Sequence, residues 1–260
     1  MTVLHLTRRF AQRALKVDVS RYPQSDPLYR TVRLMMRVGV STVLDVGANT
    51  GGYAISLRRL GYCGRIVSFE PTRRAFQDLR DAAEADARWE ACPIALGNQD
   101  GYVEIHVAGN QAASSSVLKM LNRHLEAQPD SAYTHTEEVP IRRLDSVVPE
   151  LCSGEESPFL KLDVQGAEAS VLDGSASSLR LFLGVQAEMN LVPLYDGQIA
   201  YRDLIDRLVA EGFTLVDIIP GFTDAATGQL LAADGVFMRM GSLGHIAQNH
   251  TPPSLQSPPR

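Results

Sequence analysis

The central part of the chain alternates short apolar segments with amphipathic ones, and this alternation most limits the folds open to it. Residues 42–46 form a β-branched apolar run that ends at a glycine, which is typical of a buried strand. Residues 53–60 and 73–85 have apolar side chains at helical spacing, and a second strand-like run, 65–69, lies between them. Strands that alternate with helices form right-handed βαβ units. The sequence therefore predicts a doubly wound α/β domain with a mainly parallel sheet.

The same pattern continues to about residue 240. A helix is expected at 201–209, where apolar residues recur on one face. Further strands are expected at 89–92, 102–107, 138–142, 159–164, 181–188, 213–219 and 236–240. The polar segment 108–137 separates two of these strands. We interpret it as an insertion of the hairpin and loop type that forms a lid or substrate loop.

The two ends of the chain differ in composition from its centre. Residues 1–19 alternate basic and apolar residues, which predicts an amphipathic helix, and a linker follows to about residue 27. Residues 241–260 contain four prolines among polar residues and predict a disordered tail. We therefore expect 1–27 to be helix and linker, and 28–240 to be one catalytic domain.

The turn after the first expected strand reads Asp45-Val-Gly-Ala-Asn-Thr-Gly51 and leads directly into a helix. In an open α/β sheet, ligands bind at the carboxyl ends of the strands, beside such a turn. Glycines let the backbone approach a ligand closely. The second strand ends at Glu70, 23 residues after Gly47, where a carboxylate can accept hydrogen bonds from both hydroxyls of a ribose. Together, the loop and the spaced acid predict a nucleoside cofactor.

The residue types in this loop discriminate between nucleoside cofactors. Asn49 occupies the place of the second glycine of GxGxxG, and its side chain impedes a pyrophosphate. The loop also lacks the Gly-Lys-Ser/Thr ending of a P-loop. We therefore expect S-adenosylmethionine, with its amino-acid part held by Asp45, Gly47, Asn49 and Gly51, and its ribose by Glu70. Asp45 can alternatively orient the loop, and Glu70 can cap a helix.

Several motifs resemble those of the FkbM-type methyltransferases. They are the loop that begins at Asp45, Phe69-Glu70-Pro71, Ala95-Leu96-Gly97, Leu144-Asp145, and the block Phe159-Leu-Lys-Leu-Asp-Val-Gln-Gly-Ala-Glu168, which is the most specific. The resemblance extends from about residue 39 to residue 240. It implies a class I, Rossmann-like sheet of seven strands. It also implies methyl transfer from S-adenosylmethionine, commonly to a hydroxyl of a sugar, a glycolipid or a polyketide-type metabolite.

Three carboxylates are expected at the edge of the sheet where the methyl group would be transferred. Asp163 stands at the end of one strand, Glu168 in the first turn of the next helix, and Glu188 at the end of the next strand. Clustered carboxylates raise the pKa of at least one member, which suits a base that removes a hydroxyl proton. We predict Asp163 as base or acceptor anchor, with Glu168 and Glu188 in support. Glu168 can alternatively serve only the N-terminus of its helix.

Two further chemistries compete at this edge. Asp163, Glu188 and Asn190 offer oxygen ligands of the kind that Mg²⁺ binds, but no closely spaced acidic pair marks a metal site, so Mg²⁺ is not favoured. His124 and His135 lie in the insertion and are alternative bases, although an isolated loop histidine is more often solvated.

Composition excludes several classes of partner. The net charge of −5, with both signs interspersed, argues against nucleic acid. The three cysteines lie far apart and form no CxxC pair, which favours reduced thiols and a cytoplasmic location. No apolar run is long enough to span a membrane, and the basic helix at 1–19 allows only weak contact with a membrane surface.

The residues predict a domain that binds S-adenosylmethionine, and the resemblance implies an O-methyltransferase that acts on a hydroxyl of a glycolipid sugar or a secondary metabolite. The expected partner is a small-molecule or glycolipid acceptor. Two alternatives stay open. One is an NAD-dependent oxidoreductase, which Asn49 argues against. The other is a non-catalytic scaffold that retains the fold, which the intact acidic set argues against.

Overall fold

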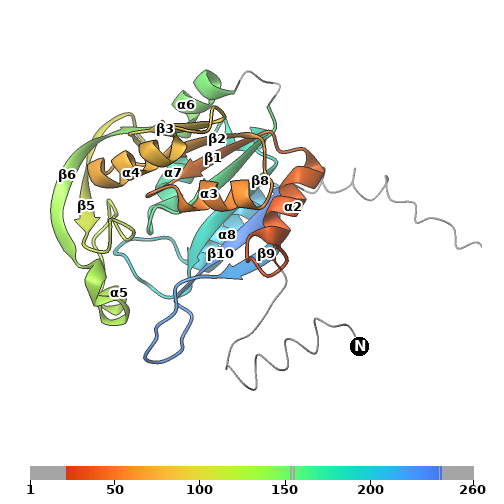
Figure 1. Ribbon diagram of the computed structural model, residues 1–260. Helices are drawn as coiled ribbons and strands as arrows, with labels where there is room; N and C mark the ends of the chain where they lie inside the picture. The colour runs from red at the N-terminus through yellow and green to blue at the C-terminus, as the bar shows by residue number, and fades with distance from the viewer. Residues whose placement is uncertain (1–21, 153, 155, 240, 242–260) are drawn as a thin grey trace, which may run out of the picture.

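A computed structural model describes residues 22–152, 154, 156–239 and 241, and its main sheet has seven strands (Figure 1). The strand order is β3-β2-β1-β7-β8-β10-β9. These strands are β1 (Thr42–Val46), β2 (Arg65–Phe69), β3 (Trp89–Cys92), β7 (Pro158–Leu162), β8 (Gly184–Asn190), β9 (Phe213–Pro220) and β10 (Ala232–Arg239). Strands β3, β2, β1, β7 and β8 run parallel, whereas β10 is antiparallel to β8 and β9. The predicted doubly wound, mainly parallel, seven-stranded sheet is confirmed.

Side-chain alternation along the strands explains why helices cover both faces of this sheet. In β1, Val43 joins one hydrophobic core and Leu44 joins the other, because successive strand residues point to opposite faces. The core around Val43 is covered by α2 (Tyr29–Val38), α3 (Gly52–Arg59) and α4 (Arg73–Ala83). The core around Leu44 is covered by α6 (Leu144–Leu151), α7 (Glu168–Asp173) and α8 (Tyr201–Ala210). The order of strands reverses between β1 and β7, so a ligand crevice is expected at their carboxyl ends.

A second, three-stranded sheet carries the insertion. It consists of β4 (Ala95–Leu96), β5 (Gly101–Ala108) and β6 (Tyr133–Arg142), and Figure 1 shows β5 and β6 beside the main sheet. Strand β6 begins five residues before its predicted start at 138. Its polar beginning resembles a loop in sequence, but the backbone pairs with β5, with Val107 opposite His135. Helix α5 (Asn122–Ala127) lies between these two strands in the chain.

Within the described residues, three α-helices lie where the sequence pattern predicts none, α2, α5 and α6. In α2 only Thr31, Val32 and Met35 are buried, a stripe too short to stand out before its packing partners are known. The predicted helix at 1–19 lies outside the described residues, as does the predicted tail apart from Gly241. Among the described residues, no helix combines the length and the apolar character that a membrane crossing requires.

Candidate active site

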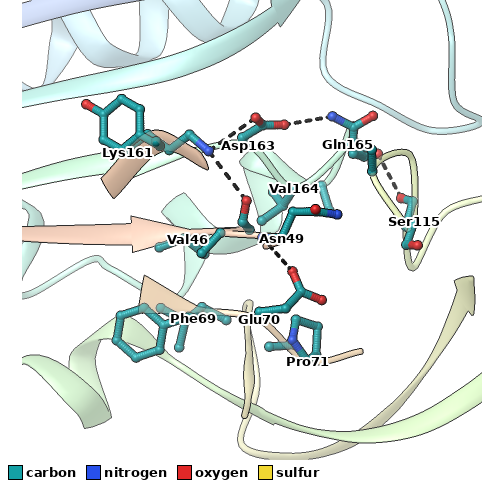
Figure 2. A pocket seen from close by; sticks show the side chains of 18 of the residues that line it. Val46, Asn49, Phe69, Glu70, Pro71, Ser115, Lys161, Asp163, Val164 and Gln165 are labelled. Atoms are coloured by element: carbon teal, nitrogen blue, oxygen red, sulfur yellow. Dashed lines mark hydrogen bonds and ion pairs between the residues drawn. The ribbon is translucent and has the colours of Figure 1, made fainter. Parts of the chain in front are cut away.

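A cavity of about 480 Å³ opens at the carboxyl ends of β1, β2 and β7, at the switch point of the sheet. We refer to it as the first cavity. Figure 2 shows Asn49 and Glu70 on one side of it, Lys161, Asp163 and Gln165 on another, and the inserted loop at its edge. The volume is within the range found for cofactor sites.

The turn after β1 needs glycine at two positions. Gly47 has φ +77°, and a Cβ atom there would overlap the backbone carbonyl of Asp163 on the neighbouring strand. Gly51 has φ +88°, and a Cβ atom there would lie 2.8 Å from the Trp89 ring. Gly47 lines the first cavity, whereas Gly51 does not and instead closes the turn at the start of α3. Gly51 therefore allows the backbone turn that leads into α3 but does not itself contact the first cavity.

The carboxylate of Glu70 connects the turn after β1 to the segment that precedes α4. Its Oε2 atom accepts a hydrogen bond from the backbone N–H of Asn49 at 2.9 Å, and its Oε1 atom accepts two from Thr72, at 2.9 and 2.6 Å. Burial raises the pKa of Glu70, and these hydrogen bonds partly offset the rise. Each carboxylate oxygen has two lone pairs, so Glu70 keeps acceptor capacity toward the cavity that it lines.

Asp45 does not line the first cavity, because its side chain is fully buried on β1. It accepts a hydrogen bond from Ser68 Oγ at 3.0 Å and pairs with the ammonium of Lys161 at 3.5 Å. Lys161 does line the cavity. The structure therefore places Asp45 behind the first cavity, paired with a residue that lines it, and the contact between Asp45 and the cofactor stays a prediction.

Asp163 lies at the centre of a short polar row. Its Oδ2 atom accepts from Lys161 Nζ at 3.1 Å, and its Oδ1 atom accepts from Gln165 Nε2 at 2.7 Å. The Asp163 side chain is 35% exposed and lines the first cavity. Burial lowers the pKa of Lys161, but the carboxylates of Asp163, Asp45 and Asp234 more than offset this, so the group stays an ammonium.

Gln165 connects this row to the next strand. Its Nε2 atom also donates to Glu188 at 3.2 Å, and its Oε1 atom accepts from the Tyr195 hydroxyl at 2.6 Å. Its backbone φ is +55°, in the left-handed region that only a few per cent of non-glycine residues occupy. Backbone strain of this kind is often found at functional sites. Gln165 belongs to the motif that ends at Glu168, but the sequence pattern predicts no role for it.

Glu168 lies behind the same turn and lines neither cavity described here. Its Oε1 atom accepts hydrogen bonds from the backbone N–H groups of Val164, at 3.1 Å, and Gly166, at 3.3 Å. The residue is 1% exposed, and burial raises its pKa to about 7. Glu168 thus holds the turn that carries Asp163 and Gln165, rather than contacting a ligand in the first cavity.

Glu188 faces a second, smaller cavity of about 170 Å³, which we refer to as the second cavity. It is lined by Asn110, Ala113, Ser114, His124, Gln128, Gln165, Glu188, Asn190, Leu194 and Phe222. Burial raises the pKa of Glu188 well above its ordinary value, and the neighbouring carboxylates add to the rise. The two cavities share Ala113 and Gln165 in their linings.

The three candidate metal ligands do not converge on one point. Asp163 lines the first cavity, whereas Glu188 and Asn190 line the second, and the Gln165 amide donates to both Asp163 and Glu188. Within the part of the chain that the structure describes, no group of three or more His, Cys, Asp or Glu residues is arranged to hold a metal ion.

A buried polar network completes the floor of the first cavity and was missed from the sequence. The Tyr53 hydroxyl donates to Gln186 Oε1 at 3.1 Å, and Gln186 Nε2 donates to Asp234 at 2.9 Å. Burial raises the pKa of Asp234, and the Asp163 carboxylate adds to this. Asp234 comes from β10, far along the chain, and pairs in register with Glu188. Only the pairing of strands brings it to the site, so no local motif marks it.

The structure divides the predicted site residues into three groups. Gly47, Asn49, Glu70 and Asp163 line the first cavity, whereas Asp45, Gly51 and Glu168 lie directly behind its wall and Glu188 lines the second cavity. All eight therefore gather at one end of the sheet. Two of their carboxyl groups, those of Asp45 and Asp163, pair with the Lys161 ammonium.

Comparison with known proteins agrees with this geometry. Residues 45–215, more than half of the chain, match the profile of the methyltransferase FkbM domain. The chain is 26% identical over 199 residues to the 2-O-methyltransferase NoeI of Sinorhizobium fredii (strain NBRC 101917 / NGR234), covering 74% of this chain and 80% of that protein. It is 24% identical over 144 residues to Methyltransferase 1 of Beauveria bassiana (strain ARSEF 2860), covering 52% of this chain and 58% of that protein.

Two solved structures that resemble the chain are distant in sequence. The magnesium protoporphyrin IX methyltransferase (ChlM) from Synechocystis PCC 6803 is 12% identical with a TM-score of 0.42, covering 92% of this chain and 98% of that chain. Fibrillarin from Aeropyrum pernix is 14% identical with a TM-score of 0.44, covering 82% of this chain and 76% of that chain. The domain match carries the assignment: this chain is a methyltransferase and belongs to the FkbM methyltransferase family.

Proposed function

We propose that the first cavity binds S-adenosylmethionine, and that the protein transfers its methyl group to a hydroxyl oxygen. The observation that carries the proposal is the pairing of the Gly47 turn with Glu70, whose Oε2 atom keeps one lone pair free for a ribose hydroxyl. When bound, S-adenosylmethionine supplies a methyl group that is already activated by its sulfonium.

The acceptor in this proposal is a neutral hydroxyl, on a sugar of a glycolipid or on a secondary metabolite. The similarity to a protein named as a 2-O-methyltransferase supports oxygen as the acceptor atom. A hydroxyl is a weak nucleophile, so the protein has to align it and accept its proton.

Asp163 is our candidate for that proton. It is the carboxylate of the central row that both lines the first cavity and is partly exposed. Lys161 and Gln165 each bond one of its oxygens, which fixes the orientation of the carboxylate toward the cavity. Glu188 supports it through Gln165, and Glu168 supports it by holding the backbone of the turn.

We propose that this chemistry proceeds without Mg²⁺. One carboxyl oxygen of Asp163 and one of Glu188 accept hydrogen bonds from the amide of Gln165, and Asn190 lines the second cavity. Activity should therefore survive EDTA, and activity lost in EDTA and restored by Mg²⁺ would assign a metal here.

The surrounding organisation belongs to the same proposal. We place the catalytic domain at 28–240 and give the insertion at 108–137 the role of a lid over the acceptor. The three cysteines, Cys63, Cys92 and Cys152, are free thiols, which supports a cytoplasmic location.

The test is a transfer assay with methyl-labelled S-adenosylmethionine against a panel of glycosides, glycolipids and hydroxylated aromatic metabolites. We expect label on oxygen, seen as an O-methyl signal in the NMR spectrum of the product. Transfer only to nitrogen or carbon acceptors in a matched panel would contradict the proposal.

A further inference from the structure

Two residues that line the second cavity carry three buried polar atoms without a hydrogen-bond partner within the described residues. They are Nδ1 and Nε2 of His124 and Oδ1 of Asn190. His124 is 2% exposed and Asn190 is 5% exposed. Buried polar atoms in native proteins nearly always have a partner, because an unpaired one costs free energy. The set therefore indicates a ligand or water that supplies the missing bonds.

The surroundings of His124 define the charge of that ligand. The ring packs against Tyr195 and Phe222, with centroids 5.3 and 5.1 Å away, and burial lowers its pKa to about 4. The imidazole is then neutral near pH 7, with one nitrogen as donor and the other as acceptor. Burial favours the uncharged form of Glu188 as well, so the carboxyl group, the neutral imidazole and the Asn190 amide give the second cavity no charge that would select an ion.

We propose that the second cavity binds two neighbouring hydroxyls of the methyl acceptor, with His124 and Asn190 as their direct partners. This inference rests on the proposed function. A hydroxyl both donates and accepts, which matches one donor nitrogen, one acceptor nitrogen and one acceptor oxygen. The 170 Å³ of the cavity equals roughly five water molecules at about 30 Å³ each, which is enough for one edge of a sugar ring.

The position of the second cavity connects this binding to the chemistry. Gln165 lines both cavities and bonds both Asp163 and Glu188. An acceptor held by His124 therefore presents its next hydroxyl past Gln165 toward Asp163. Because His124 comes from α5, the insertion would select the acceptor while the main sheet holds the cofactor.

The direct test uses the wild-type protein with S-adenosylhomocysteine and three probes, the methyl pyranosides of glucose, galactose and mannose. Between them these probes present both cis and trans pairs of neighbouring hydroxyls. We expect crystals soaked with a pyranoside to show its hydroxyls within hydrogen-bonding distance of His124 and Asn190. Water alone in the second cavity with all three probes, or pyranoside bound elsewhere, would overturn the inference.

Two variants test the same contacts in solution. His124→Phe keeps an aromatic ring between Tyr195 and Phe222 but removes both nitrogens, and Asn190→Leu keeps the size of the side chain. Each should weaken pyranoside binding, measured by NMR titration, by about tenfold. Asn122→Leu, at an exposed position of the same helix as His124 and outside the lining of both cavities, is the matched control and should leave binding unchanged.

Affinity for S-adenosylhomocysteine distinguishes a failure of this inference from a failure of the proposed function. His124 and Asn190 do not line the first cavity, so both variants should bind this probe as the wild type does, which also shows that they fold. Unchanged pyranoside affinity in both variants would refute the role of the second cavity. No binding of S-adenosylhomocysteine to the wild type would instead refute the proposed function.

Discussion

The first cavity is built from polar groups that already bond one another, whereas the second cavity holds buried polar atoms that lack partners among the described residues. In the first, Glu70 accepts three hydrogen bonds, and Asp163 is held from both sides. In the second, both nitrogens of His124 and one oxygen of Asn190 are unpaired. The first cavity is thus pre-organised, and the second depends on its ligand to complete its hydrogen bonds.

This difference separates two tasks. A site with a fixed network holds its ligand at low cost in reorganisation, which suits a cofactor that every turnover uses. A site with unsatisfied groups gains most from the ligand that satisfies them all, and it discriminates against others. Substitutions of residues that line the first cavity should therefore change cofactor affinity or turnover. They should leave pyranoside binding in the second cavity unchanged.

The largest expected effect is on turnover in Asp163→Asn. The amide keeps the size of the side chain but cannot take a proton, so kcat should fall by about a thousandfold. Affinity for S-adenosylhomocysteine, measured by calorimetry, should change little. Asp206→Asn, at an exposed position of α8, is the control. If Asp163→Asn stays active, the base lies elsewhere, and Glu188 on the second cavity becomes the next candidate.

Next in size is the loss of stability in Gly47→Ala. The new Cβ atom would overlap the Asp163 backbone at a residue whose φ is +77°, so the free energy of unfolding should drop by roughly 3 kcal/mol. Urea denaturation measures it. Gly52→Ala is the matched control, since a Cβ atom at that helical glycine meets nothing within 4 Å. Equal stability of the two variants would show that the turn is not pre-organised as described.

A pH effect should follow from Glu168. Because its pKa rises from 4.5 to about 7 on folding, the folded chain binds this proton more tightly than the unfolded chain does. The stabilisation is complete below about pH 4.5 and is lost as the pH rises through 7. In Glu168→Gln, the decline in unfolding free energy from pH 5 to pH 8 should shrink by roughly 2 kcal/mol. An unchanged pH slope would contradict the buried position of Glu168.

The smallest of these effects is on cofactor affinity in Glu70→Gln. The amide retains one acceptor oxygen in place of two, so binding of S-adenosylhomocysteine should weaken by about tenfold. The control is Glu84→Gln, at an exposed position at the end of α4, which should bind S-adenosylhomocysteine as the wild type does. Pyranoside binding in the second cavity should be the same in both variants, and a loss there would show that the two cavities are not independent.

The same division explains how far the sequence alone could reach. The alternating pattern and the spacing between Gly47 and Glu70 are local, so they predict the sheet and the first cavity. The second cavity is assembled from residues near 110, 124, 190 and 222, which only the tertiary fold brings together. The sequence predicts that Asp45 contacts the cofactor directly. The spacing does not show that Asp45 is buried behind the first cavity and pairs with Lys161, which lines it.

The most direct measurement is calorimetric titration of the full chain with S-adenosylhomocysteine and, separately, with NADH. Binding of S-adenosylhomocysteine at one site per chain, weakened in Glu70→Gln and retained in Asp163→Asn, is the predicted result. Binding of NADH without binding of S-adenosylhomocysteine would contradict the assignment of the first cavity, and with it the proposed methyl transfer.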